Sequence, residues 1–134
     1  MKAKTYKAFV CPSCGYIDRR GNKIVEEVFT GVTRVYVDPN SGEEYDFEEC
    51  PAYEPRALLC ENCGGEIPLR REEKDVPLLK RKSALLTLLV QIEERPGGEL
   101  FVTPLGDYWK QRGDELKSLL SKRRGVTKVV VTTT

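Results

Sequence analysis

The 134-residue sequence predicts an α+β fold, in which a strand-rich first part precedes a second part built as a small α/β unit. Two observations predict this order. Short β-prone segments separated by turn residues fill the first half, whereas apolar residues recur at helical spacing in the second half. The polar stretch 66–75 separates the two patterns, so we expect one domain over residues 1–70 and another over residues 76–134.

Strands are expected in five short β-prone segments of the first half, namely residues 5–10, 24–29, 33–37, 43–47 and 57–59. The third and fourth segments alternate apolar and polar residues and flank Asp38-Pro-Asn-Ser-Gly42, a sequence typical of a tight turn. Together they predict a β-hairpin. The first and last segments each lead directly into a pair of cysteines.

The second part is expected to run helix, strand, helix, strand. Asp75 can cap the N-terminus of the first helix, whose first turn contains Pro77. From Leu78 to Glu94 the apolar residues fall on one broad side of a helical wheel, which predicts a largely buried helix. A strand is the alternative over residues 84–92, because apolar residues also alternate there.

A second helix is expected after a short strand that ends near Thr103. Thr103 can act as its N-cap and Pro104 can occupy its first helical position. Gly125 is a natural C-cap, while Gly113 weakens the middle of this helix by roughly 1 kcal/mol and can split it. The β-branched segment 127–134 predicts the last strand.

Four cysteines stand in two pairs with Cys-x-x-Cys spacing, and glycine follows each pair: Cys11-Pro-Ser-Cys14-Gly and Cys60-Glu-Asn-Cys63-Gly. The turn inside each pair lets both sulfurs face one ion, and the glycine relieves backbone strain. Four sulfurs suit a closed tetrahedral site, so Cys11, Cys14, Cys60 and Cys63 are predicted to hold a structural Zn²⁺. Iron is the alternative ion, and two independent redox or disulfide pairs are a further alternative.

Residues 9–16, Phe-Val-Cys-Pro-Ser-Cys-Gly-Tyr, resemble the first knuckle of rubredoxins, and residues 60–64 are similar to their second knuckle. Asp38-Pro-Asn-Ser-Gly42 and Phe47-Glu-Glu49 are similar to two further segments of that family. The resemblance covers at most residues 5–67. It implies the rubredoxin-like fold that zinc ribbons share, with the four paired cysteines as ligands. This sequence departs from the family in its long insertion, which contains the expected hairpin.

Charge is divided unevenly along the chain. Residues 1–75 contain 11 Lys and Arg against 15 Asp and Glu, whereas residues 76–134 contain 11 against 6. The first part therefore has a net charge of −4 and the second part +5. A basic half can meet phosphates, which supply most non-specific affinity for nucleic acids. The predicted nucleic-acid-binding residues are Lys80, Arg81, Lys82, Lys110, Lys117, Lys122, Arg123 and Arg124.

Two further patterns concern this basic half. Lys110, Lys117 and Arg124 are seven residues apart, which predicts a row along one edge of the last helix. Residues 100–106, Leu-Phe-Val-Thr-Pro-Leu-Gly, with the helix expected after them, resemble the last wing strand and following helix of winged-helix regulators. That resemblance implies a nucleic-acid role.

The sequence thus predicts a non-enzymatic zinc protein that binds DNA or RNA through its basic half. One alternative is a protein-interaction module with structural zinc, whose last helix packs on a partner or on a second copy. Another is a rubredoxin-like one-electron carrier with iron. An enzyme acting on a small-molecule substrate is not expected, because the chain has no histidine and Gly97-Gly98 lacks the Lys-Ser/Thr of a phosphate loop.

Other features concern location and source. No segment reaches the roughly 18 apolar residues needed to span a bilayer, and the N-terminus lacks the apolar core of a signal peptide. We therefore expect a cytoplasmic protein without a membrane partner. Cys50 is interpreted as a small buried thiol, and Tyr108 and Trp109 as core residues. The composition, rich in Lys, Arg and Glu, resembles that of small four-cysteine proteins of hyperthermophiles and their viruses.

Overall fold

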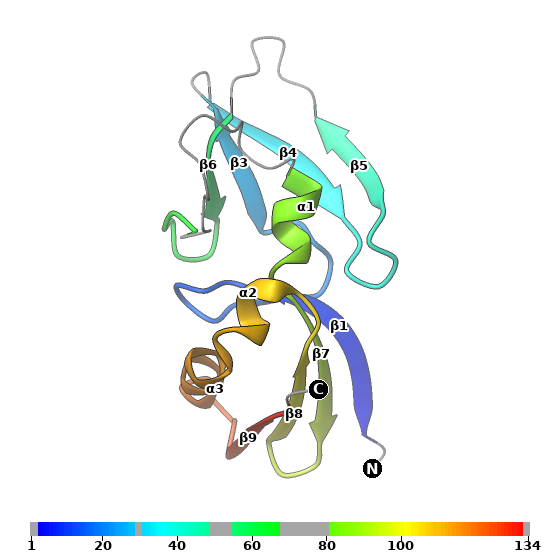
Figure 1. Cartoon of the computed structure of the whole chain (residues 1–134), viewed down its shortest axis with the longest axis vertical. Coiled ribbons are helices and arrows are strands. Elements are labelled where there is room, and N and C mark those ends of the chain that lie inside the picture. Colours follow the sequence, from blue (N-terminus) through cyan, green and yellow to red (C-terminus); the bar gives the residue numbers. More distant parts are fainter. Residues whose placement is uncertain (1–2, 29–30, 49–54, 68–80, 133–134) are drawn as a thin grey trace.

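Figure 1 shows the computed structural model of the chain, which describes residues 3–28, 31–48, 55–67 and 81–132. The elements, in chain order, are β1 (Lys4–Val10), β2 (Ile17–Asp18), β3 (Ile24–Val28), β4 (Gly31–Val37), β5 (Glu44–Glu48), β6 (Pro55–Cys60), α1 (Arg81–Leu86), β7 (Leu89–Arg95), β8 (Glu99–Pro104), α2 (Asp107–Lys110), α3 (Gly113–Ser121) and β9 (Lys128–Val131). The fold is α+β, as the sequence predicts. None of the helices in these ranges is long and apolar enough to cross a membrane.

The first strand belongs to a five-stranded sheet with the order β2-β1-β7-β8-β9. Strand β1 pairs with β7 in antiparallel register from Lys4 opposite Glu94 to Phe9 opposite Leu89. All neighbours in this sheet are antiparallel except β8 and β9, which are parallel. The predicted boundary near residue 70 assigns β1 to the first domain, but hydrogen bonding places it in the sheet formed by the second part of the chain.

The remaining strands form a four-stranded sheet with the order β5-β4-β3-β6. Strands β4 and β5 are the predicted hairpin, and they pair in antiparallel fashion. Their turn is closed by two hydrogen bonds, because the Gly42 N–H donates to the Asp38 carbonyl at 2.7 Å and the Asp38 N–H donates to the Glu43 carbonyl at 2.9 Å. The strand predictions in this half are thus confirmed, and the insertion between the two cysteine pairs forms a sheet of its own.

The helix predicted from Leu78 to Glu94 is confirmed only over α1. Asp75, Pro77 and the first predicted turn lie outside the described residues. Beyond α1 the prediction is wrong, and the strand alternative is correct from Leu89 onward. The reason is burial at alternate positions: Val90 and Ile92 are fully buried, whereas Gln91 between them is exposed. The order of the second part is therefore helix, two strands, two helices and a strand.

The second predicted helix also begins later than expected. Pro104 is the last residue of β8, and the next two backbone N–H groups both donate to the Leu89 carbonyl at 2.9 Å. Helical structure therefore starts at Asp107, and Thr103 is not its cap. The predicted split is confirmed, because α2 and α3 are separate and α3 begins at Gly113. Helix α3 ends at Ser121, so Gly125 lies beyond it and is not the C-cap.

One hydrophobic core extends between the two sheets. Phe9, Leu85 and Trp109 are among its fully buried side chains, and Ile24 and Val37 from the four-stranded sheet belong to the same cluster. In Figure 1, α1 lies between the two sheets, while α2 and α3 lie beside the five-stranded sheet. Burial of Tyr108 and Trp109 confirms that these aromatic residues are core residues.

Candidate metal centre

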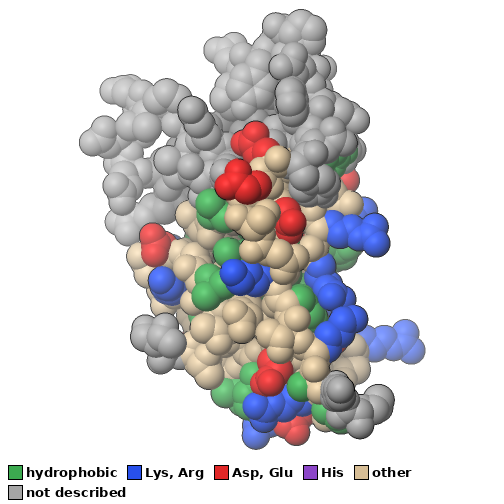
Figure 2. All heavy atoms as spheres, turned by 90° about the vertical axis from the view of Figure 1, so that its right-hand side faces the viewer, with side chains coloured by type: hydrophobic (Ala, Val, Ile, Leu, Met, Phe, Trp, Pro, Cys, Tyr) green, Lys and Arg blue, Asp and Glu red, His purple; other side chains and the backbone are tan. Residues whose placement is uncertain are grey.

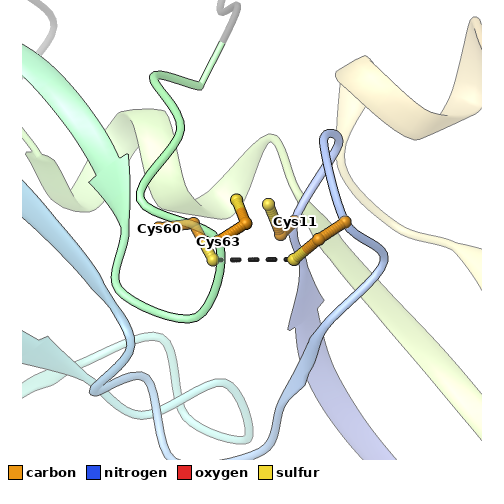
Figure 3. Close-up of side chains that lie close together, drawn as sticks. Cys11, Cys60 and Cys63 are labelled. Atoms are coloured by element: carbon orange, nitrogen blue, oxygen red, sulfur yellow. Dashed lines mark hydrogen bonds between the residues drawn. The ribbon is translucent and has the colours of Figure 1, made fainter.

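The four paired cysteines come together where the two sheets meet. Cys11 directly follows β1 of the five-stranded sheet, and Cys60 is the last residue of β6 of the four-stranded sheet. The Sγ atoms of the four cysteines all lie within 4.8 Å of one another. Figure 3 shows the sulfurs of Cys11, Cys60 and Cys63 pointing into the same space between the two loops. The predicted ligands are therefore assembled from two different sheets.

The first cysteine pair forms a turn that two backbone hydrogen bonds close. The Gly15 N–H donates to the Cys11 carbonyl at 2.9 Å, and the Cys11 N–H donates to the Tyr16 carbonyl at 3.1 Å. These bonds bring the start and the end of the loop together. The Cys11 and Cys14 side chains can then project toward a common point.

The second pair repeats this pattern at the same spacing. The Gly64 N–H donates to the Cys60 carbonyl at 2.7 Å, and the Cys60 N–H donates to the Gly65 carbonyl at 3.1 Å. Gly15 and Gly64 have φ angles of +74° and +71°, a conformation in which a Cβ atom is strained. The glycine after each Cys-x-x-Cys motif therefore relieves backbone strain, as the sequence predicts, and the two loops have equivalent backbone structures.

Hydrogen-bond donors also approach the sulfur atoms. Such contacts run from the Ser13 N–H to Cys11 Sγ at 3.4 Å, from the Gly65 N–H to Cys63 Sγ at 3.4 Å, and from the Asn62 side-chain amide to Cys14 Sγ at 3.6 Å. N–H donors stabilise thiolates, which are the form that binds metals. The Asn62 contact additionally joins the second knuckle to the first.

Burial disfavours the negatively charged thiolate form of these cysteines. It raises the pKa of the Cys11 thiol and of the Cys60 thiol above the ordinary value. For Cys14, burial also acts to raise the pKa, but hydrogen bonds led by the one from Asn62 outweigh it and lower the pKa. A bound cation is the group that would offset the negative charge of several thiolates in this setting.

The sulfur positions fit a tetrahedral metal site. A Zn–S distance of about 2.3 Å implies about 3.8 Å between neighbouring sulfurs of a regular tetrahedron. The dashed line in Figure 3 marks the contact between Cys14 Sγ and Cys60 Sγ, which is 3.8 Å long. A disulfide bond would require about 2.05 Å. Because all four positions of such a site are filled by protein sulfurs, the cluster is suited to holding a metal ion rather than to activating water.

The C-terminal part of the chain supports the first knuckle. Arg123 donates a hydrogen bond from Nη1 to the Gly15 carbonyl at 3.2 Å. A Cβ atom placed on Gly15 would lie 3.4 Å from Leu119 Cβ, so α3 packs directly on this loop. The fully buried Trp109 donates from Nε1 to the carbonyl of Val10, the residue before Cys11, at 3.2 Å. The ligand loop is thus held by both helices that follow β8.

Sequence reasoning missed Asp18, which lies shortly after the first knuckle. Its side chain is only 2% exposed, and its carboxylate accepts hydrogen bonds from the backbone N–H groups of residues 20–23 at 2.8–3.3 Å. These bonds fold the chain into a tight loop. A Cβ atom on Gly21 would lie only 1.7 Å from the Val37 carbonyl oxygen, so the loop contacts β4 closely. Asp18 followed by Gly21-Asn22 is the signal, since such residues favour turns.

The predicted basic residues do not form the expected row. Lys110 lies in α2, Lys117 lies in α3, and Arg124 follows the end of α3, so the break between the helices interrupts the sevenfold spacing. These three side chains are exposed, as are those of Lys122 and Arg123. Lys80 lies outside the described residues, as does Cys50, and Arg81 and Lys82 lie in α1, where the structure does not describe their side chains.

Arg19 and Arg20, which follow the first knuckle, form a second basic segment in addition to residues 122–124 at the end of α3. The Arg19 guanidinium lies 3.9 Å from the centre of the Tyr6 ring. Burial raises the pKa of Tyr6 well above its ordinary value, and its hydrogen bond to Glu94 acts in the same direction, whereas the charges of Arg19 and Arg123 act against it. Arg123, which bonds to Gly15, and Arg19, which directly follows β2, therefore both lie near the first knuckle, although they are far apart in the sequence. Figure 2, which views the molecule from the right-hand side of Figure 1, shows basic side chains along one edge of that side and acidic side chains elsewhere on it.

Fold and site together define an α+β protein with a cluster of four cysteines that could hold a metal ion, at the junction of two sheets. No protein family, no curated protein and no solved structure gives a significant match to this chain. Its function is therefore inferred from the cysteine geometry and from the surface around it.

Proposed function

We propose that this chain is a non-enzymatic zinc protein that binds DNA or RNA, and that its zinc ion is structural. The observation that carries the proposal is that two basic segments, residues 19–20 and residues 122–124, lie next to the first knuckle. In this interpretation the ion holds the surface in shape, and the surface makes the contacts with phosphate. Zinc is favoured over iron because a redox-inert ion with four thiolates is the usual structural centre of small strand-rich units.

The proposed contact region, here called the knuckle surface, consists of the five exposed residues Arg19, Arg20, Lys122, Arg123 and Arg124. Arg123 uses one N–H group for the Gly15 carbonyl and retains further donors for a phosphate. The guanidinium of Arg19 lies over the Tyr6 ring, which restricts the motion of this side chain and lowers the entropy lost on binding. A basic surface that is partly preordered in this way suits a nucleic-acid backbone better than scattered lysines do.

The first experiment measures binding of labelled single-stranded and duplex oligonucleotides by fluorescence anisotropy at several salt concentrations. If all five residues each neutralise one phosphate of a duplex, the logarithm of the association constant falls with log salt with a slope of roughly −4.5. Lys122→Glu should weaken binding and reduce the magnitude of that slope by about 1. Absence of binding at low salt would contradict the proposal.

Lys110→Glu is the matched control, because it makes the same charge change at an exposed lysine of α2, outside the knuckle surface. It should affect binding much less than Lys122→Glu does. Equal loss in both variants would mean that net charge, and not this surface, determines affinity.

The identity of the ion is tested separately by elemental analysis of untagged protein produced with both iron and zinc available. We expect one zinc ion per chain and a colourless protein. One iron per chain would contradict the zinc assignment and make the electron-carrier alternative the stronger one, with the reduction potential as the next measurement.

A further inference from the structure

Strand β9 exposes an unpaired edge. It is the outermost strand of its sheet, and within the described residues it pairs only with β8. The Thr132 N–H donates to the Val102 carbonyl of β8 at 2.8 Å. Because backbone polar groups alternate in direction along a strand, Val131 and Val129 direct their N–H and carbonyl groups away from β8. Such an edge can accept another strand.

A groove of about 500 Å³ runs along this edge. One wall is formed by one side of α3 and the other by the strand itself; the lining residues are Gly113, Asp114, Lys117, Ser121 and Thr127–Val131. A helix beside an unpaired strand edge is the arrangement in which several domain families take up an extended peptide as an added strand. The groove therefore has the shape for a single β-strand.

The charges of the groove favour an acidic occupant. Lys117 and Lys128 are exposed, and neither forms an ion pair with any residue in the part of the chain that the structure describes. Asp114 is the one acidic residue of the lining. An added strand that carries carboxylates would supply ion-pair partners for these two ammonium groups.

The chain itself contains an acidic edge strand. Strand β5 has the sequence Glu-Tyr-Asp-Phe-Glu, with three carboxylates and no cation, and among the described strands it pairs only with β4. In Figure 1, β5 lies at the upper end of the molecule and β9 at the lower end, so the two edges cannot meet within one copy. We propose that β5 of one copy adds to β9 of a second copy and occupies the groove beside α3.

This contact joins two different surfaces, so a joined pair keeps one free groove, on the copy that supplies β5, and one free β5, on the other copy. Repetition of the contact builds open chains, or rings if the rotation closes. Since the attraction comes from charges at an exposed groove, salt should weaken it.

The test is a charge swap followed by sedimentation velocity of the zinc-loaded protein. The wild-type chain should show a mass that rises with concentration at low salt and falls as salt is added. Variant one, Lys117→Glu with Lys128→Glu, and variant two, Glu44→Lys with Asp46→Lys, should each be monomeric alone. Mixed together they should associate again, because each groove then meets a β5 of opposite charge.

Several outcomes would overturn the proposal. A wild-type chain that stays monomeric at every concentration in low salt excludes the contact. Self-association of variant two alone excludes β5 as the occupant and indicates another contact, such as β9 with β9. Lys110→Glu with Lys122→Glu makes the same charge change as variant one outside the groove, and loss of association there would show a net-charge effect. Circular dichroism and zinc content confirm that each variant is folded.

A peptide probe separates the groove from its occupant. Glu-Glu-Tyr-Asp-Phe-Glu-Glu, residues 43–49, should compete with self-association and shift the NMR signals of the Val129 and Val131 amides. Binding of this peptide to a wild-type chain that remains monomeric would overturn self-association and assign the groove to an acidic strand of a different protein.

Discussion

Asp18 shows how one side chain can organise a loop that no periodic pattern predicts. Among the residues whose burial is described, it is the one buried charged side chain, and four backbone N–H groups converge on it. Three of these bonds end at Oδ1 and one, from Lys23, ends at Oδ2. The carboxylate therefore replaces the partners that a regular strand would have supplied to this backbone.

The loss of stability on substitution of Asp18 should depend on how many hydrogen-bond acceptors the new side chain retains. Asp18→Ala leaves all four N–H groups without this acceptor, and we expect it to lower the free energy of unfolding by about 2–4 kcal/mol. Asp18→Asn should cost less, because its amide oxygen can still serve the three bonds at Oδ1. Urea unfolding of the zinc-loaded protein measures both. Equal losses would show that the charge itself, rather than the count of acceptors, stabilises the loop.

Tyr6 offers a prediction with a defined pH dependence. Its hydroxyl donates to Glu94 Oε1 at 2.6 Å, and burial, together with this carboxylate, raises the pKa of the phenol. A raised pKa in the folded state means that the contribution to stability is complete below the unfolded value of about 10 and decreases as the pH rises above it.

Tyr6→Phe should therefore lower stability near neutral pH by about 1–2 kcal/mol, since a hydrogen bond to a charged group is lost. The difference between wild type and variant should shrink at alkaline pH, because only the wild type has a phenol at position 6 to ionise. Unfolding free energies measured on both sides of pH 10 test this. A constant difference across that range would contradict the assigned role of Tyr6.

At the scale of elements, some predictions succeed because the signal is local. Cys-x-x-Cys-Gly specifies its own turn, and Asp38-Pro-Asn-Ser-Gly42 specifies the β4–β5 connection, so ligands and hairpin could be predicted from short segments. The helix expected up to Glu94 fails for a different reason. Residues 84–92 satisfy both the helical and the strand period, and only the partner strand β1, far away in the sequence, favours the strand.

Trp109 connects an element of the second part to the ligand loop. Its indole N–H bonds to the carbonyl just before Cys11, and its ring stands edge-on to Tyr108 with centroids 4.9 Å apart. Trp109→Phe removes the donor and leaves a void, so we expect a loss of about 2–4 kcal/mol in unfolding free energy. Denaturation followed by circular dichroism provides the measurement. A loss below the effect of an ordinary surface substitution would show that α2 does not support the knuckle.

At the scale of the whole molecule, the four-cysteine cluster lies between two sheets that share no strand. Each sheet contributes one knuckle, so an ion bound to all four sulfurs links the end of β1 to the end of β6. This arrangement could not be predicted from the cysteine spacing, which is the same in a compact ribbon whose ligands belong to one sheet. The pairing of β1 with β7 is what separates the two ligand pairs between sheets.

Removal of the ion should therefore affect the two sheets unequally. The five-stranded sheet retains its long β1–β7 and β7–β8 ladders and its two helices. We expect the β3–β6 pair, which ends at Cys60, to depend more on the bound ion for its stability. After chelation, amide hydrogen exchange should accelerate most in β3, β6 and the two knuckles. Uniform loss of protection in both sheets would instead indicate a single cooperative unit.

The β1–β7 pairing also determines when the five-stranded sheet can form during synthesis of the chain. Phe9 pairs with Leu89, 80 positions later, so the first strand leaves the ribosome long before its neighbour exists. Closing so large a loop is slow. An ion captured by both knuckles once residue 63 has emerged would already tether β1 to the four-stranded sheet. The metal would then keep the first strand in place while the ribosome makes the rest of its sheet.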